Sequence, residues 1–138
     1  MVSLVIGKPA MALGEQGLDL TRFYAQEITE AKLVGDNEFR LVFQDGATLT
    51  IHDAGQKCCE HRYITCDDDP KSLVGGKLYR IELKEGVNNA GKYGDYNDTM
   101  FVEIATDKAF ITLCTHNEYN GYYGGFDIVL TGVENADA

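Results

Sequence analysis

The sequence predicts a mainly β domain of the α+β type, in which an antiparallel, hairpin-connected sheet curls into a small barrel or a two-layer sandwich beside one or two short helices. Apolar and polar residues alternate with a period of two in several short runs, as in strands with one buried face. The chain has 15 glycines but only two prolines, which indicates many tight turns. Its 138 residues suffice for one hydrophobic core, so we expect a single globular domain over residues 1–138.

Two short helical segments are expected. Near residues 19–26, four apolar residues recur at helical spacing, and Asp19 can cap the first turn. These apolar residues are Leu20, Phe23, Tyr24 and Ile28. A second helical turn is expected from Asp69 through Leu73, because Pro70 suits the first position of a helix.

The first predicted hairpin turns at the Asp-Gly pair that follows Phe43. A two-residue loop would place Phe43 opposite Thr48 and mix apolar with polar residues on each face of the sheet. A three-residue loop over residues 45–47 instead places Phe43 opposite Leu49 and keeps one apolar face. We therefore predict a three-residue or bulged turn.

The second predicted hairpin has a two-residue loop, Asp107-Lys108. This loop pairs Ile104 with Ile111. Two positions further along, Val102 pairs with Leu113, so one face is apolar throughout. The opposite face mixes apolar and reactive side chains, and we expect something to cover it. It carries Phe101, Glu103, Phe110, Cys114 and His116.

Two further strands and a long loop complete the predicted sheet. Tyr79, Ile81 and Leu83 alternate with more polar residues, which predicts a strand whose apolar face they share. Residues 85–98 are rich in Gly, Asn and Asp, which is typical of a long loop. Apolar residues alternate again over residues 126–130, which predicts a closing strand.

Charge and composition exclude several classes of partner. The 12 basic and 22 acidic residues give a net charge of -10, so we expect neither a nucleic acid nor an anionic membrane as partner. No apolar run approaches the roughly 20 residues of a membrane-spanning helix. The N-terminal Val-Ser-Leu-Val-Ile stretch lacks a basic region and a cleavage site, so we expect a cytoplasmic protein with reduced cysteines.

Two segments, His52–Asp69 and Cys114–Gly125, contain every cysteine and every histidine of the chain. Their carboxylates and amides suit polar recognition, while tyrosines offer rigid aromatic contact area and glycines let a ligand approach the backbone. The predicted ligand-binding residues are Cys58, Cys59, Glu60, Glu118, Asn120, Tyr122 and Tyr123. The alternative is a glycine-rich connection between strands whose tyrosines cover the end of the barrel.

Zinc binding and acid–base catalysis are weaker alternatives for the same segments. Cys58-x-x-His61 and Cys114-x-His116 could together supply a Cys2His2 zinc site, but the paired Cys-x-x-Cys knuckle is missing. We therefore expect no metal and no cofactor, with the cysteines acting as small buried apolar residues. Glu60 and Glu118 would form an acid–base pair only if both pointed into one pocket. More often such a glutamate pairs with a nearby arginine, such as Arg62, at the surface.

The motifs resemble a small family of uncharacterised domains encoded by bacteria and their phages. The resemblance runs from about Ile28 to Leu130 and rests on four motifs in order. They are Asp45-Gly46, Cys58-Cys59-Glu60, Leu73-Val74-Gly75 and, within Glu118–Tyr123, Asn120-Gly121-Tyr122-Tyr123. It implies a compact, cytoplasmic, β-rich domain that is often carried by mobile genetic elements. His61, Cys66, Cys114 and His116 do not match the family pattern, which weakens the zinc hypothesis.

The expected function is a non-enzymatic binding module that recognises a small polar molecule or another protein. Glu60 and Asn120 would provide polar recognition, and Tyr122 and Tyr123 would form aromatic walls. One alternative is a hydrolase-type enzyme that uses the two glutamates or a Cys/His zinc site. Another is a structural homo-oligomer without a ligand site, paired through an exposed strand edge near residues 1–6.

Overall fold

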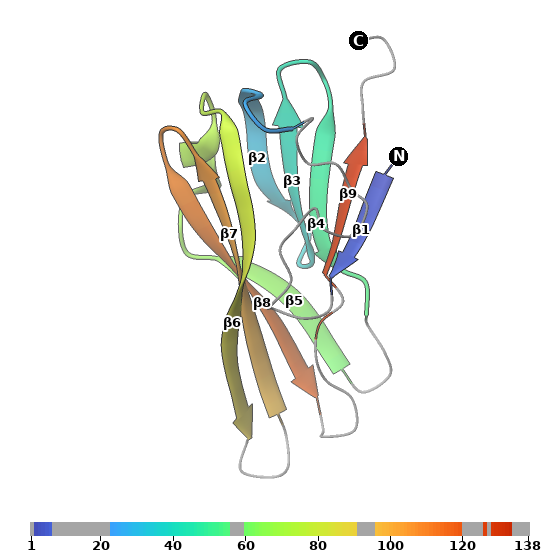
Figure 1. Cartoon of the computed structure of the whole chain (residues 1–138). Helices are drawn as coiled ribbons and strands as arrows, with labels where there is room; N and C mark the ends of the chain where they lie inside the picture. The colour runs from blue at the N-terminus through green and yellow to red at the C-terminus, as the bar shows by residue number, and fades with distance from the viewer. Residues whose placement is uncertain are drawn as a thin grey trace.

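The computed structural model describes two antiparallel sheets that pack together as an open, sandwich-like fold (Figure 1). The described residues are 2–6, 23–55, 60–90, 96–119, 126 and 128–133. The predicted mainly β, antiparallel architecture is confirmed in its sandwich form, and the sheets do not close into a barrel. No helix among these residues is long and apolar enough to cross a membrane.

The first sheet has five strands in the order β1-β9-β4-β3-β2. Their bounds are β1 Val2–Ile6, β9 Ile128–Val133, β4 Thr48–Asp53, β3 Glu38–Phe43 and β2 Ile28–Val34. The chain enters at the β1 edge, and β9 inserts between β1 and β4, so residues from both ends of the chain lie side by side (Figure 1). The closing strand predicted near residues 126–130 is therefore an interior strand of this sheet.

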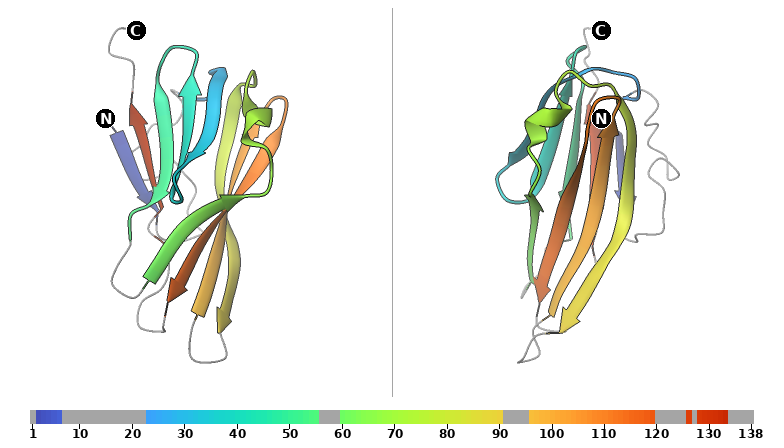
Figure 2. Two further views of the ribbon diagram at one scale, coloured as in Figure 1. Left: turned by 180° about the vertical axis from the view of Figure 1, so that it is seen from behind. Right: turned by 90° about the vertical axis from the view of Figure 1, so that its left-hand side faces the viewer.

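The second sheet has four strands in the order β5-β8-β7-β6. Their bounds are β5 Glu60–Cys66, β8 Phe110–Tyr119, β7 Tyr96–Thr106 and β6 Leu78–Ala90. These strands are longer, and in Figures 1 and 2 the lower ends of all four extend beyond the lower end of the first sheet.

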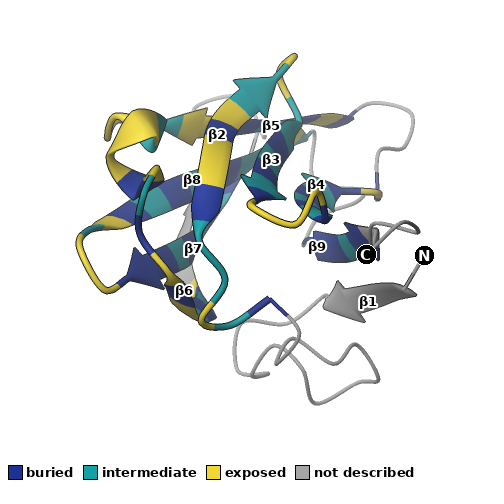
Figure 3. Cartoon of the chain, turned by 90° about the horizontal axis from the view of Figure 1, so that it is seen from above, coloured by how far each residue is buried: buried dark blue, intermediate teal, exposed yellow. Residues whose placement is uncertain are grey.

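Alternating side chains from both sheets form one hydrophobic core. In the first sheet Leu41, Leu49 and Ile51 are fully buried, and Val102 and Ile111 of the second sheet belong to the same cluster and also have no exposed surface. Figure 3 shows the resulting bands of buried and exposed residues along the strands whose burial is described. Burial of each such side chain stabilises the fold by about 1.5–3 kcal/mol.

The first hairpin has the predicted three-residue loop but a different register. The structure pairs Leu41 with Leu49, so the predicted pairing of Phe43 with Leu49 is wrong by two positions. The cause is Gly46, whose positive φ of 88° suits the last loop position and closes the loop one residue earlier than predicted. Because a two-residue shift preserves the alternation, the apolar face remains intact.

The second hairpin is confirmed. Ile104 lies opposite Ile111, and Val102 lies opposite Leu113. Its other face is only partly covered, because Phe110 is 57% exposed and the other four predicted residues of that face are half-buried.

Two bulges in β6 overturn two expectations. The register shifts between Leu78 and Arg80, so Tyr79 lies 58% exposed instead of sharing the face of Ile81 and Leu83. The predicted loop over residues 85–98 is wrong, because β6 and β7 continue through most of it. Its composition allows a second bulge after Glu85.

Only the second predicted helical segment forms. Pro70–Leu73 is a 3-10 helix, η2, whose N-cap Asp69 accepts a hydrogen bond from the Lys71 amide at 3.0 Å. In the first segment residues 23–25 form a turn and Glu27 makes an isolated bridge, while residues 19–22 lie outside the described part. The expected helix over 19–26 is therefore wrong in its second half, where Phe23 packs into the core from a turn.

Gly86 provides a test of the β6–β7 packing. A Cβ atom at this position would lie 2.0 Å from the Thr99 carbonyl oxygen, so Gly86→Ala should destabilise the fold by about 3 kcal/mol or more. Gly35→Ala is the matched control, because Gly35 has a positive φ of 65° but open space around it, and should cost only about 1 kcal/mol. Urea unfolding measures both, and equal losses would contradict the close approach at Gly86.

Candidate functional site

The two motif segments are attached to the second sheet at neighbouring points. β5 begins at Glu60 and β8 ends at Tyr119, and these two residues lie directly opposite each other. Of the predicted ligand-binding residues, Glu60 and Glu118 lie within the strands. Cys58, Cys59, Asn120, Tyr122 and Tyr123 lie outside the described residues.

Glu60 and Glu118 lie on opposite faces of the sheet. Glu118 is opposite His61, one position away from the pair that contains Glu60, and successive side chains of a strand point to opposite faces. Glu60 is 9% exposed and faces the interior, whereas the Glu118 side chain is 48% exposed. The acid–base pair of the enzyme alternative requires one shared pocket, and the sheet separates the two carboxylates.

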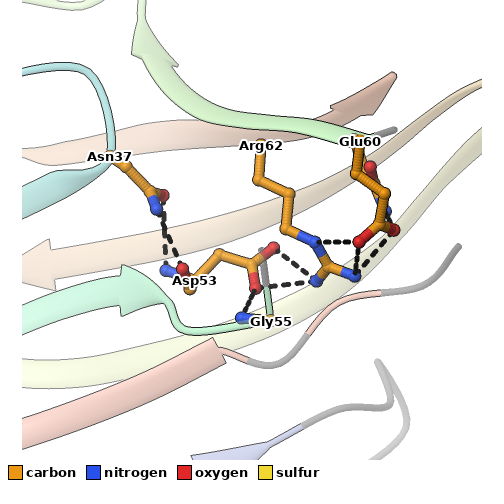
Figure 4. A network of polar contacts seen from close by, with 6 residues as sticks. Asn37, Asp53, Gly55, Glu60 and Arg62 are labelled. Atoms are coloured by element: carbon orange, nitrogen blue, oxygen red, sulfur yellow. Dashed lines mark hydrogen bonds and ion pairs between the residues drawn. The ribbon is translucent and has the colours of Figure 1, made fainter. Parts of the chain in front are cut away.

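The interior face carries a buried ionic network centred on Arg62 (Figure 4). Arg62 is 4% exposed, and its guanidinium lies between the carboxylates of Asp53 and Glu60. One terminal nitrogen donates to both oxygens of Asp53 at 2.8 and 3.1 Å. The other donates to Glu60 at 2.9 and 3.2 Å, and Nε donates to Glu60 at 3.3 Å. The pairing of Glu60 with Arg62 occurs as predicted, but in the interior instead of at the surface.

Amide groups extend this network to neighbouring strands. Asn117 on β8 is fully buried and donates from Nδ2 to Glu60 at 2.9 Å. The Gly55 amide donates to Asp53 Oδ1 at 3.0 Å, and Asn37 Nδ2 donates to the Asp53 carbonyl at 2.8 Å. The network therefore joins β4 of the first sheet to β5 and β8 of the second sheet.

Arg62 holds the residues on either side of the segment that contains Cys58 and Cys59. Asp53 precedes that segment, Glu60 follows it, and the same guanidinium binds both carboxylates. Burial lowers the pKa of Arg62, but the hydrogen bonds and charges of the two carboxylates outweigh it, so the pKa lies above its ordinary value. The positive charge is thus permanent, and it offsets one of the two carboxylate charges.

The outer face carries a different cluster, formed by His61, Tyr63, His116 and Glu118. The Tyr63 hydroxyl donates to Glu118 Oε1 at 3.3 Å, and His61 Nδ1 lies 3.5 Å from Glu118 Oε2. The Tyr63 ring stacks on His116 with centroids 4.4 Å apart and an interplanar angle of 5°, and it also contacts His61 at 4.7 Å. Tyr63 therefore contacts both imidazoles.

This arrangement bears on the zinc hypothesis and on the state of the described cysteines. Cys58, one of the four zinc candidates, lies outside the described residues, and the described part of the chain contains no group of three or more His, Cys, Asp or Glu residues that could hold a metal. Burial raises the pKa of the Cys114 thiol, with a smaller contribution from Asp67, so the thiol stays protonated at neutral pH. Cys66 is likewise free, and burial raises the pKa of its thiol too.

A model of the family DUF7448, a domain of unknown function, matches residues 14–129. The chain belongs to this family. The match confirms the resemblance to an uncharacterised domain family, and it spans both segments of the DUF7448 domain that carry the predicted site. No curated protein and no solved structure matches the chain.

Sequence reasoning missed Asp53 and Asn117, and it placed Arg62 of this DUF7448 domain at the surface. Two signals point to the observed positions. Arg62 lies two positions before the buried Ile64 on β5, and Asn117 lies four positions after the buried Leu113 on β8, so each shares the interior face of its strand. The contact with Asp53 could not be read from alternation, because it joins two sheets.

Removal of the buried guanidinium should strongly destabilise the domain. Arg62→Met leaves two carboxylates buried without their cation, and we expect a loss of about 3–5 kcal/mol. Arg40→Met is the matched control, because Arg40 makes a 2.8 Å ion pair with Glu38 at a partly exposed site and should lose only about 0–1 kcal/mol. Denaturant unfolding measures both. Similar losses in the two variants would contradict a structural role for the buried network.

His116 should make stability depend on pH. Burial lowers its pKa below the ordinary 6.5, although Glu118 and Asp67 partly oppose this, so the folded protein binds fewer protons than the unfolded chain. The contribution of His116 to the free energy of unfolding is therefore fully present above pH 6.5, and it is lost as the pH falls from 6.5 towards the lower folded pKa. His116→Gln can keep the hydrogen bond that Nε2 makes with Thr65 and should show a smaller loss of unfolding free energy between pH 7.5 and 5.5. Equal losses would refute this contribution.

Proposed function

We propose that this DUF7448 domain is a non-enzymatic binding module. Its contact surface is the end of the second sheet where β5 begins and β8 ends. The observation that carries the proposal is the pairing of Glu60 with Tyr119, which attaches the two motif segments side by side. The buried Arg62 network beneath this pair holds that end of the sheet in place, and recognition sites work best on such rigid elements.

The outer-face cluster supports a partner that presents a cationic, hydrogen-bond-donating group. The Glu118 carboxylate is half-exposed, and Tyr63 and His61 hold its oxygens at the surface of the sheet. Tyr63 adds an aromatic ring, which attracts cations as well as apolar groups. The net charge of -10 favours the approach of cations over anions. A small polar molecule and a loop of a partner protein can both supply this group.

The resemblance to domains of bacteria and their phages adds a biological setting to the proposal. Carriage on a mobile element would make a host or defence component a natural protein partner, and the domain would then act in the cytoplasm.

Amide chemical shifts of the labelled full chain, titrated with capped single amino acids, test the proposed ligand chemistry. N-acetyl-lysine amide and N-acetyl-arginine amide should shift the amides of residues 61, 63 and 118, because their cations pair with Glu118. N-acetyl-glutamine amide and N-acetyl-glutamate amide should leave these signals in place. The same lysine or arginine side chain is then placed within a short capped peptide. A higher affinity of the peptide than of the single amino acid indicates a protein-loop site, and an equal affinity indicates a small-molecule site.

Glu118→Gln should abolish the response to the cationic probes. Glu103→Gln is the matched control, because Glu103 is another outer-face glutamate of the same sheet but lies near Arg80 and Lys84. Shifts that do not depend on probe charge, or a response that survives Glu118→Gln, would overturn the proposal.

A further inference from the structure

The edge of β2 that faces away from β3 pairs, at its beginning, with an extended segment of the chain. Ile28 donates its amide to the Gly76 carbonyl at 2.9 Å, and the Gly75 amide donates to the Ile28 carbonyl at 2.8 Å. Glu27 and Lys77 form an antiparallel bridge beside these bonds. β2 is the last strand of its sheet, so residues 75–77 lie where a sixth antiparallel strand would begin along its edge.

This extended segment does not continue along the edge, because η2 precedes it in the chain. Asp69 and Pro70 start the 3-10 helix, so the residues before Val74 leave the edge instead of continuing along it. Among the described residues, no other segment makes a backbone hydrogen bond to Glu30–Val34 on the side away from β3. With respect to the described part of the chain, the edge is therefore open directly beyond the stretch that pairs with residues 75–77.

A groove lies between this open edge and η2, which is beside β2 in Figure 3. Its volume is about 500 Å³, which is of the order needed for a few residues of extended peptide. It is lined by Thr29, Glu30, Ala31, Lys32, Lys71 and Val74.

We propose that this groove binds an extended peptide segment of another protein, which adds to β2 as an antiparallel strand in line with residues 75–77. Backbone hydrogen bonds supply affinity in this binding mode, and alternate side chains supply specificity. The surface is separate from the outer-face cluster near Glu118 and does not depend on it.

Side chains of the groove define the chemistry of the peptide. Val74 is 43% exposed and offers an apolar contact. Glu30 is engaged by Lys32 at 2.7 Å, whereas Lys71 makes no ion pair with any described residue. The unbalanced charge is therefore an ammonium, which favours a peptide that alternates apolar residues with Asp or Glu. At physiological ionic strength a Debye length of about 8 Å screens much of the protein's overall negative charge from a carboxylate held beside Lys71.

The two edge strands of the second sheet, β5 and β6, are less open than β2. On β5 the Ile64 amide donates to the Asp36 carbonyl at 2.7 Å, in the middle of the strand. On β6 the first residue pairs with residues 25–26, and two bulges interrupt the rest. Bulged edges oppose the addition of a further strand. β2 also has a register shift, between Ile28 and Glu30, but its register is continuous along the open stretch Glu30–Val34.

The test uses the labelled full chain and the capped pentapeptide Ac-Thr-Val-Asp-Val-Thr-amide. Binding should shift the amides of residues 29–34 and 71–76. The same peptide with two alternate backbone nitrogens methylated loses two hydrogen bonds and should bind about tenfold more weakly. Replacement of its Asp by Lys, or Lys71→Glu in the protein, should weaken binding about two- to fivefold. Lys84→Glu on β6 is the matched control and should leave the affinity unchanged.

Three outcomes would overturn the proposal. Equal binding of the methylated peptide would show that no strand is added. Shifts confined to residues 2–6 would place the peptide on β1 instead. Concentration-dependent shifts of residues 29–34 without peptide would assign the groove to a second copy of this chain.

Discussion

The guanidinium of Arg62 is the interaction on which the rest of this structure depends. The two sheets share an apolar core along most of their length, but beside the motif segments their contact becomes ionic. Asp53 belongs to the first sheet, and Glu60 and Arg62 belong to the second, so one planar cation with two carboxylate partners joins both layers. Such a contact tolerates little rearrangement, because a buried charge that loses its partner is costly.

The two faces of β5 carry different groups of residues, and only the inner face takes part in this ionic contact. Along β5, Glu60 and Arg62 face inward and are saturated with hydrogen bonds, whereas His61 and Tyr63 face outward beside Glu118. The inner residues stabilise the end of the sheet, and the outer residues form the proposed contact surface. A strand alternation of two residues is thus enough to place a structural role and the proposed recognition role next to each other in the sequence.

Alternation of apolar residues predicted most of the strands and the pairing of Ile104 with Ile111, because a buried face constrains register strongly. It failed where a local backbone feature decided the outcome: the positive φ of Gly46 moved the first hairpin, and a bulge turned Tyr79 outward. The site was predictable only in part. Residue type marked Glu60 and Glu118 as noteworthy, but the burial of Arg62 depends on Asp53, which another sheet supplies. Contacts between sheets leave no periodic trace in a sequence.

Residues 54–59 connect the first sheet to the second, and one side chain fixes both ends of this stretch. Asp53 and Glu60 stand at the two ends, and Arg62 binds both carboxylates. The points at which the chain leaves one sheet and enters the other are therefore set by a single guanidinium.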